Sequence, residues 1–201
     1  MSTAILSDPK LFVTLFRIDS DLAERARADR CSCGGRLDTA DYPRKPRAPI
    51  DLGPEHRRRH SFCCAVCRCR TTPPSVRFFA RRVYAFPVVV LLTALSAGLS
   101  GSRLATLRKE FRVDRRTLER WRLWWREVFP ETRFWKAARA RFSPPVDGAQ
   151  LDAVRNRFAE GLDGLVLLLR FLSPMSCTSH ALRGSLRTRR GRSWAPDRPP
   201  G

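Results

Sequence analysis

Cysteine is the residue type in this sequence with the clearest capacity for chemistry, and the chain contains seven of them. Cys31 and Cys33 form one short pair, and Cys64 and Cys67 form a second pair further along the chain. Two separated pairs of thiolates present four soft ligands to one tetrahedral ion with little strain in either loop, which is how a zinc ribbon binds its metal. We therefore predict a zinc site formed by Cys31, Cys33, Cys64 and Cys67.

Other residues near the second pair leave alternatives open. Cys63 and Cys69 flank it, so either one is an alternative zinc ligand, and His56 and His60 are close enough in sequence to replace one thiolate. Reduced thiols without a metal are a further alternative. A catalytic zinc would need an open coordination position and a base such as Glu55, and we do not favour that reading.

The segment from residue 31 to residue 70 needs something other than apolar burial to order it. It is rich in Gly, Pro, Arg and Cys and contains almost no long apolar run. A metal would supply most of its folding free energy. Gly34 and Gly35 follow the first cysteine pair, and we expect them to adopt positive φ angles that turn backbone amides toward the sulfur atoms.

The charge balance indicates a polyanionic partner. The chain has 39 Lys and Arg against 19 Asp and Glu, a formal net charge of +20, and an isoelectric point near 11.3. Arginine dominates, and its planar guanidinium suits paired contacts with phosphate oxygens and guanine edges. Duplex DNA is the favoured partner and RNA is an alternative. A solvated basic surface without a nucleic-acid partner is the remaining interpretation.

A candidate helix-turn-helix unit follows in the second half of the chain. Helical patterns cover residues 103–111 and 115–128, with Asp114 as a natural N-cap for the second helix and Ala105 placed to permit close helix packing. The predicted core between the helices comprises Leu104, Leu107, Phe111, Val113, Leu118 and Trp121. An ordinary helical hairpin within a bundle is the competing interpretation.

The second of these helices carries the predicted nucleic-acid contacts. Its exposed face contains arginines where a recognition helix keeps the side chains that enter a groove. Arg112 occupies the turn where such motifs often have glycine, so we expect either a slightly different turn or mild backbone strain there. The predicted contact residues are Arg112, Arg115, Arg116, Arg120 and Arg122.

The expected fold class is mainly α with a small zinc-ribbon β module, and the helix-turn-helix is followed by a packing helix. An uncharged stretch at 83–99 contains Pro87 and Gly98, which favours a buried helix over a membrane span. Further helical pattern covers 149–172. The predicted units are an N-terminal lead-in at 1–30 with a helix capped by Ser20 at 21–30, the ribbon at 31–77, the helical domain at 78–172, and a disordered basic tail at 173–201.

Four segments carry a resemblance to a known family, and they lie between about residues 20 and 172. They are Cys31-Ser32-Cys33-Gly34-Gly35-Arg36-Leu37, Tyr42-Pro43-Arg44-Lys45-Pro46-Arg47, Cys67-Arg68-Cys69-Arg70-Thr71-Thr72-Pro73-Pro74-Ser75-Val76-Arg77-Phe78, and Thr117-Leu118-Glu119-Arg120-Trp121. In these segments the chain resembles short transposase-like or transposase-accessory proteins of bacterial mobile elements, which join an N-terminal zinc ribbon to a helix-turn-helix. The resemblance implies sequence-directed DNA binding as an accessory subunit or regulator of transposition.

The sequence reveals no catalytic set. Between Pro145 and Leu172 the acidic residues are Asp147, Asp152, Glu160 and Asp163, and all four lie in or beside one helical stretch. Two-metal phosphoryl transfer instead needs carboxylates that converge from different elements. We therefore expect a non-enzymatic protein, and an active recombinase that depends on Asp147 or Asp152 is the alternative. We expect it in the cytoplasm with the nucleoid, because no secretory signal is apparent. The second hypothesis is a protein-interaction module of a DNA-processing assembly that binds nucleic acid without sequence preference.

Overall fold

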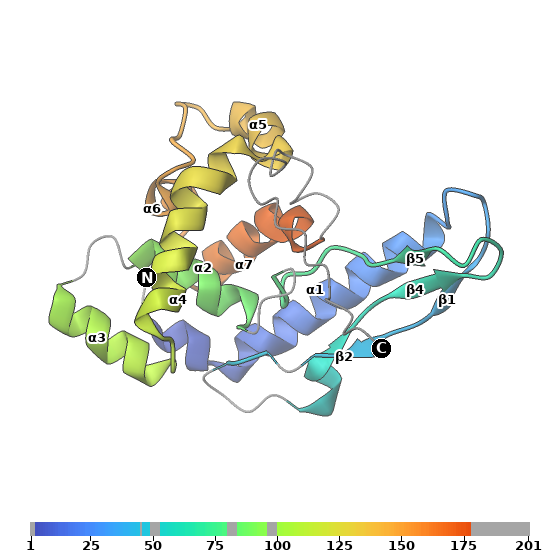
Figure 1. The fold of residues 1–201 in the computed structure, drawn as a ribbon, viewed down its shortest axis with the longest axis horizontal. Coiled ribbons are helices and arrows are strands. Elements are labelled where there is room, and N and C mark those ends of the chain that lie inside the picture. Colours follow the sequence, from blue (N-terminus) through green and yellow to red (C-terminus); the bar gives the residue numbers. More distant parts are fainter. Residues whose placement is uncertain (1–2, 45, 49–52, 80–83, 96–99, 178–201) are drawn as a thin grey trace, which may run out of the picture.

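The computed structural model describes residues 3–44, 46–48, 53–79, 84–95 and 100–177. A group of helices and a small antiparallel β module make up the molecule, with the β module beside the C-terminal part of the long helix α1 (Figure 1). The predicted combination of mainly α structure with a small β module is confirmed. The helices are α1 (Pro9–Ala28), α2 (Phe86–Leu95), α3 (Gly101–Glu110), α4 (Arg115–Leu123), α5 (Arg133–Ala138), α6 (Leu151–Arg155) and α7 (Gly161–Leu172), and the strands are β1 (Leu37–Thr39), β2 (Tyr42–Pro43), β3 (Arg58–Arg59), β4 (Phe62–Cys64) and β5 (Arg70–Thr71).

Helix α1 begins much earlier than the sequence pattern predicted. Asp8 is its N-cap, with its carboxylate accepting a hydrogen bond of 2.9 Å from the Lys10 amide, and Pro9 occupies the first turn, where its missing N–H costs nothing. The predicted cap Ser20 lies inside the helix, and its hydroxyl donates to the Phe16 carbonyl at 3.1 Å. The predicted start was therefore wrong, because the apolar face already begins with Leu11 and continues through the polar residues around Ser20.

The β module is stabilised by a very small apolar cluster. Strands β1, β4 and β5 form an antiparallel sheet in that order, with Leu37 opposite Cys64 and Phe62 opposite Thr71, and β2 pairs separately with β3. Its buried cluster comprises Ala23, Cys31, Leu37, Phe62 and Cys64. Because Ala23 comes from α1, the long helix contributes to this cluster as well as to the main core.

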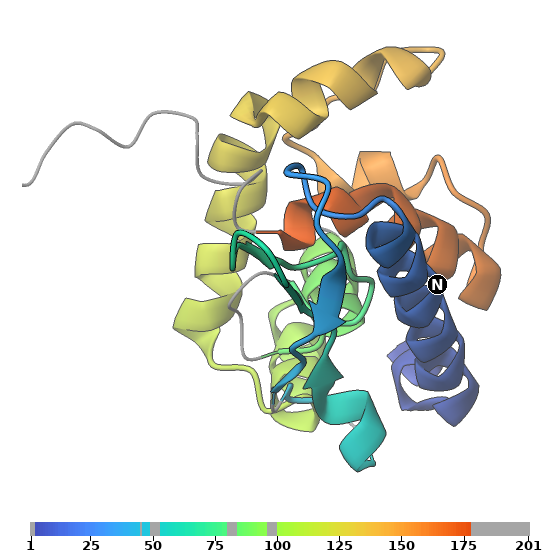
Figure 2. The same ribbon diagram turned by 90° about the vertical axis from the view of Figure 1, so that its right-hand side faces the viewer.

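Helix α2 forms the centre of the main core. Every residue from Phe86 to Ala94 is buried, and the Thr93 hydroxyl is satisfied by donating to the Val89 carbonyl at 2.7 Å. It packs against α4, α6 and α7, and Figure 2 shows it between α1 and the continuous run from α4 to α5. The predicted buried helix is thus confirmed over its described residues, and within them no helix combines the length and apolar character that a membrane span requires.

Helices α3 and α4 are joined by a short turn at residues 111–114, close to the predicted boundaries. Helix α4 passes directly into a π-helical turn at Trp124–Val128, so its predicted length is nearly right. Trp121 is buried, as predicted, and Trp125 is buried too, whereas Ala105 is exposed and not buried against a neighbouring helix. Phe111, Val113 and Leu118 are also buried, Leu104 is half-buried, and the side chain of Leu107 lies outside the described ones.

The C-terminal part of the described chain forms two helices where one or two were expected. Helices α6 and α7 are separated by residues 156–160, and Gly164 in α7 contacts the Ala159 carbonyl so closely that any side chain there would collide with it. A 3-10 turn at Ser173–Ser176 follows, with Ser173, Met175 and Ser176 buried. Ordered structure therefore extends past residue 172, and the rest of the predicted tail, 178–201, lies outside the described residues.

A buried ion pair joins α1 to the segment after the β module. The Asp19 carboxylate accepts hydrogen bonds from the Ser75 hydroxyl at 2.6 Å, the Val76 amide at 2.7 Å and Arg77 Nε at 2.8 Å. Arg77 also donates to the carbonyls of His56 and Arg58, both at 3.0 Å. The side chains of Asp19 and Arg77 are 0% and 4% exposed, so both charges depend on these partners.

We expect Asp19→Asn to destabilise the fold by about 3–5 kcal/mol, because it leaves the buried Arg77 guanidinium without a counter-charge while keeping the side-chain shape. Chemical denaturation monitored by circular dichroism measures this change. The exposed Asp21, two residues further along α1, provides the control, and Asp21→Asn should shift the unfolding free energy by less than about 0.5 kcal/mol. Equal effects of the two substitutions would contradict the role given to the ion pair.

Candidate metal centre and nucleic-acid interface

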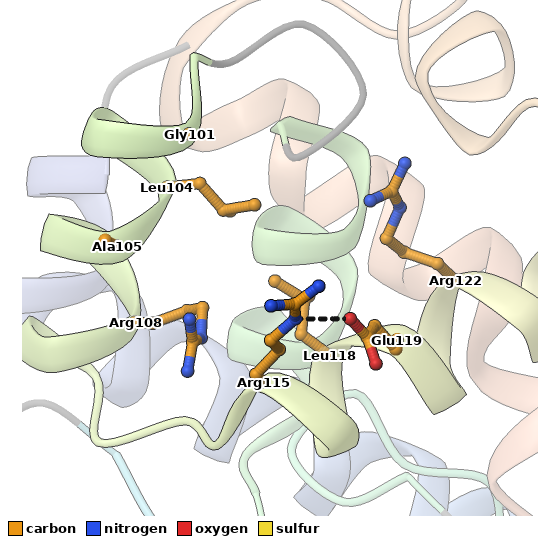
Figure 3. Close-up of a pocket in the computed structure, with 8 residues that line it drawn as sticks. All are labelled: Gly101, Leu104, Ala105, Arg108, Arg115, Leu118, Glu119 and Arg122. Carbon is orange, nitrogen blue, oxygen red and sulfur yellow. Dashed lines mark hydrogen bonds and ion pairs between the residues drawn. The ribbon is translucent and has the colours of Figure 1, made fainter.

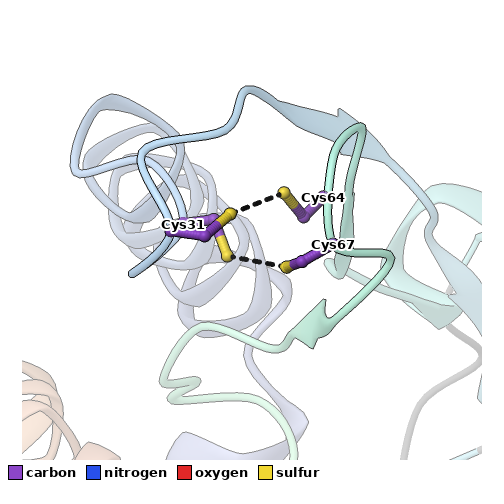
Figure 4. A group of neighbouring side chains, drawn as sticks. Cys31, Cys64 and Cys67 are labelled. Atoms are coloured by element: carbon purple, nitrogen blue, oxygen red, sulfur yellow. Dashed lines mark hydrogen bonds between the residues drawn. The ribbon is translucent and has the colours of Figure 1, made fainter.

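The four predicted zinc ligands come together at one end of α1. Cys31 and Cys33 follow the C-terminus of the helix, Cys64 ends β4, and Cys67 lies in the turn before β5. The sulfurs of Cys31 and Cys67 are 3.5 Å apart, those of Cys33 and Cys64 are also 3.5 Å apart, and all four lie within 4.8 Å of one another. A tetrahedral zinc ion with Zn–S bonds near 2.3 Å separates its sulfurs by about 3.8 Å. The cluster therefore has the size of a four-thiolate metal site (Figure 4).

Each cysteine pair is shaped by a tight turn that ends in a left-handed residue. Gly34 has φ of 81° and its amide donates to the Cys31 carbonyl at 2.7 Å, while Arg68 has φ of 60° and its amide donates to the Cys64 carbonyl at 3.1 Å. Gly35 does not share this conformation. A Cβ at Gly35 would lie 2.6 Å from the Cys64 sulfur, so this glycine is needed for close approach rather than for a positive φ angle.

Backbone amides around the sulfurs favour thiolates. Hydrogen bonding from the backbone amide of Cys33 lowers the pKa of Cys31, and the amides of Cys67 and Val66 lower the pKa of Cys64 to about 6. For Cys67 the amide two residues further on acts in the same direction, but hydrogen bonds with the other three sulfurs outweigh it and raise its pKa. The lowered pKa values of Cys31 and Cys64 favour the thiolate form that a metal cation binds.

The alternative ligands have other neighbours. Cys63 directs its thiol toward the Arg68 carbonyl at 3.5 Å, and Cys69 is exposed. His56 Nδ1 lies 2.8 Å from the Glu55 carboxylate, and His60 Nδ1 lies 3.3 Å from that of Asp41. Among the described residues, only the group of four cysteines assembles three or more potential ligands.

The predicted nucleic-acid contacts all lie on exposed surface. Arg115, Arg116, Arg120 and Arg122 project from α4, and Arg112 lies in the turn before it. Asp114 caps α4 as predicted, with its carboxylate accepting from the Arg116 amide at 2.8 Å. An open hollow of about 600 Å³ lies over this face and is lined by Arg116, Glu119, Arg120, Arg122, Leu123 and Arg126.

Sequence reasoning missed two residues of this hollow, Leu123 and Arg126. Both lie three or more residues beyond Arg120, so the spacing of one helical face would have included them. Leu123 is 46% exposed, so the hollow has an apolar side chain among its arginines. Arg126 donates to the neighbouring Glu127 carboxylate at 2.9 Å, a surface pair that leaves its other N–H donors available.

The turn between α3 and α4 ends the first helix with a Schellman motif. The Val113 amide donates to the Arg108 carbonyl at 2.8 Å and the Arg112 amide to the Lys109 carbonyl at 3.2 Å. This motif places Arg112 at a left-handed φ of 49°, where glycine is preferred, which matches the expected strain. The Tyr84 hydroxyl holds the turn by donating to the Arg112 carbonyl at 2.9 Å.

We expect Arg112→Gly to stabilise the protein by about 0.5–1 kcal/mol, because glycine adopts the left-handed conformation without a steric penalty. Arg116→Gly, the same chemical change inside α4, should instead destabilise it by about 1 kcal/mol. Urea denaturation of both variants measures the two shifts. Destabilisation of similar size in both would show that Arg112 carries no backbone strain.

Comparisons with protein-family models, with curated proteins and with solved structures find no match to this chain. The functional inference therefore rests on two features of the molecule itself. One is the cluster of four sulfurs at the end of α1. The other is the arginine-rich face of α4, with the hollow above it.

Proposed function

We propose that this protein binds zinc through four cysteines and binds duplex DNA through helix α4. The observation that carries the proposal is the exposed arginine face of α4, which is open to solvent on one side and supported by the buried helix α2 on the other. A net charge of +20 supports a polyanionic partner.

Zinc is the proposed metal because all four nearby ligand atoms are thiol sulfurs. Soft thiolates in a closed tetrahedral set are typical of structural zinc, whereas catalytic zinc keeps a coordination position open. The small apolar cluster of the β module supports this assignment, since four buried residues of the module and Ala23 of α1 are too few to order a segment of this length. The proposal therefore gives the metal a structural role and assigns the protein no catalytic reaction.

The pair α3 and α4 has features of a helix-turn-helix unit, with α4 as the recognition helix. Their four-residue turn contributes Phe111 and Val113 to the core, and Trp121 anchors α4 against Tyr84 with ring centroids 5.0 Å apart. An α-helix with its side chains is about 10–12 Å wide, which suits the major groove of B-DNA. Arg116 and Arg120, one turn apart, would then face the base edges.

The side chains around α4 suggest which of them would contact DNA bases and which would contact phosphates. Arginine forms paired hydrogen bonds with guanine, and an exposed apolar side chain such as Leu123 can contact the thymine methyl group. Arg115 is paired with Glu119 at 2.7 Å, so it is better placed for a phosphate than for a base. Exposed arginines of the β module would add further phosphate contacts; they include Arg36, Arg57, Arg58, Arg68 and Arg70.

The resemblance of the cysteine and α4 segments to transposase-like proteins supports a role beside a bacterial mobile element. In that role the protein would act as an accessory subunit or regulator of transposition, bound to the nucleoid. The second candidate function is a protein-interaction module with only non-specific DNA affinity. The exposed Leu123 and Val128 near the end of α4 favour this candidate, because apolar surface also suits a protein partner.

The zinc assignment predicts one zinc ion per chain in native mass spectrometry. Cys64→Ser should remove the ion and lower the melting temperature, because it deletes one of the four clustered thiols. Cys63→Ser is the matched control, since the neighbouring Cys63 lies outside the cluster and should leave the zinc bound. Parent protein without zinc, or equal retention by both variants, would refute the assignment.

The DNA assignment predicts that Arg116→Ala and Arg120→Ala each cost about 1–3 kcal/mol on a duplex selected from a random pool. The loss should be smaller on random duplexes, because base-reading contacts contribute little there. Fluorescence anisotropy at two salt concentrations measures both. Arg139→Ala, which removes an exposed arginine after α5, is the control. Equal losses on selected and random duplexes would instead favour the protein-interaction module.

A further inference from the structure

A groove of about 300 Å³ lies between α3 and α4 (Figure 3). One face of each helix lines it, because residues three, four and seven positions apart share a helical face. The contributing residues are Gly101, Leu104, Ala105 and Arg108 from α3, and Arg115, Leu118, Glu119 and Arg122 from α4.

The groove contains a hydrogen-bond donor without an acceptor. Nε of Arg108 is shielded from solvent and finds no partner among the described residues. Burying an N–H group without an acceptor is unfavourable, so such a donor is expected where another group completes its hydrogen bonding. Figure 3 shows the Arg108 and Arg115 side chains projecting into the space between the two helices.

The charges in the groove select an anion. Three guanidinium groups face one carboxylate, which leaves a net charge of +2. Glu119 accepts a hydrogen bond from Nε of Arg115 at 2.7 Å, and the terminal nitrogens of Arg115 keep their own N–H donors. Arg108 and Arg115 lie near the turn, whereas Arg122 lies two helical turns further along α4.

The wall between the charged ends is apolar. Leu104 and Ala105 of α3 face Leu118 of α4, so an occupant needs an uncharged part beside its anionic group. A volume near 300 Å³ matches the lower end of the range for small-molecule sites. Guanidinium groups match the oxygens of phosphate in paired, charge-assisted hydrogen bonds.

We propose that the groove between α3 and α4 binds a phosphate ester, with the phosphate on Arg108 and Arg115 and the organic part against Leu104 and Leu118. The phosphate would belong either to a free mononucleotide or to a nucleic-acid backbone, since the chemistry is shared. Glu119 and Arg122 line both this groove and the hollow over α4. If α4 reads DNA as proposed above, an occupied groove would alter the surface that it presents.

The first test uses the full chain without DNA, with AMP and inorganic phosphate as probes in isothermal titration calorimetry. We expect saturable binding of AMP by the parent, tighter than that of phosphate because of the apolar wall. Arg108→Ala should weaken it at least tenfold. Arg133→Ala, which removes an exposed arginine of α5 outside the groove, should leave it unchanged. Arg108→Ala should also keep or raise the melting temperature, because it removes an unsatisfied buried donor.

The second test distinguishes the two sources of phosphate. If neither AMP nor phosphate binds, the phosphate belongs to a nucleic-acid backbone. Arg108→Ala should then weaken binding to a 20-base-pair duplex equally for all sequences, and lower the slope of log affinity against log salt concentration by about 0.9. Binding of AMP, phosphate and duplex that is the same in parent and Arg108→Ala protein overturns the proposal, as does no binding of any probe. The first test contains no DNA, so its result stands whether or not α4 recognises a duplex.

Discussion

A buried charge is unfavourable unless every polar atom around it finds a partner, and the Asp19 carboxylate in α1 meets this condition with three donors. Those donors come from consecutive residues, Ser75 to Arg77, just after the β module. The Ser75 amide also donates to the Ser176 hydroxyl at 2.7 Å, which brings the C-terminal turn to the same place. One carboxylate thereby fixes where the chain leaves the β module and enters the helical core.

The long helix α1 makes this arrangement continuous. Its first turns pack into the main core, Ala23 belongs to the small cluster of the β module, and the first cysteine pair begins just after its end. A metal at the sulfurs and the ion pair at Asp19 would therefore hold α1 at two separate points along its length. The proposed metal would add to the ion pair in positioning the β module, because the module's own apolar cluster is small.

Two local signals in the sequence predicted local features correctly, whereas the predicted cap at Ser20 was wrong. Cysteine spacing identified the four clustered sulfurs, and Asp114 identified the start of α4, because both depend on neighbouring residues. The partner of Asp19 could not be predicted, since Arg77 is 58 positions away and the pairing depends on how whole elements pack. Gly35 was correctly predicted to be important at the cysteine cluster, but the predicted reason, a positive φ angle, was wrong. Its actual role is close approach to Cys64, which depends on a strand from elsewhere in the chain.

Two local conflicts in the described structure lie at α3 and the turn that follows it. Others lie elsewhere, at the left-handed Arg30 and Arg68 and at unsatisfied nitrogens of Arg59, His60, Trp125 and Arg155. The Asp19 network satisfies its charges, whereas the α3–α4 turn contains a non-glycine left-handed residue at Arg112 and a buried donor without acceptor on Arg108. No described side chain of α3 is fully buried, so packing does not compensate for these features. Strain and unsatisfied polar groups tend to persist where binding, rather than stability, determines the sequence. The buried helix α2 supports α4 from behind, so these features of α3 and its turn lie next to a helix that the core holds in place.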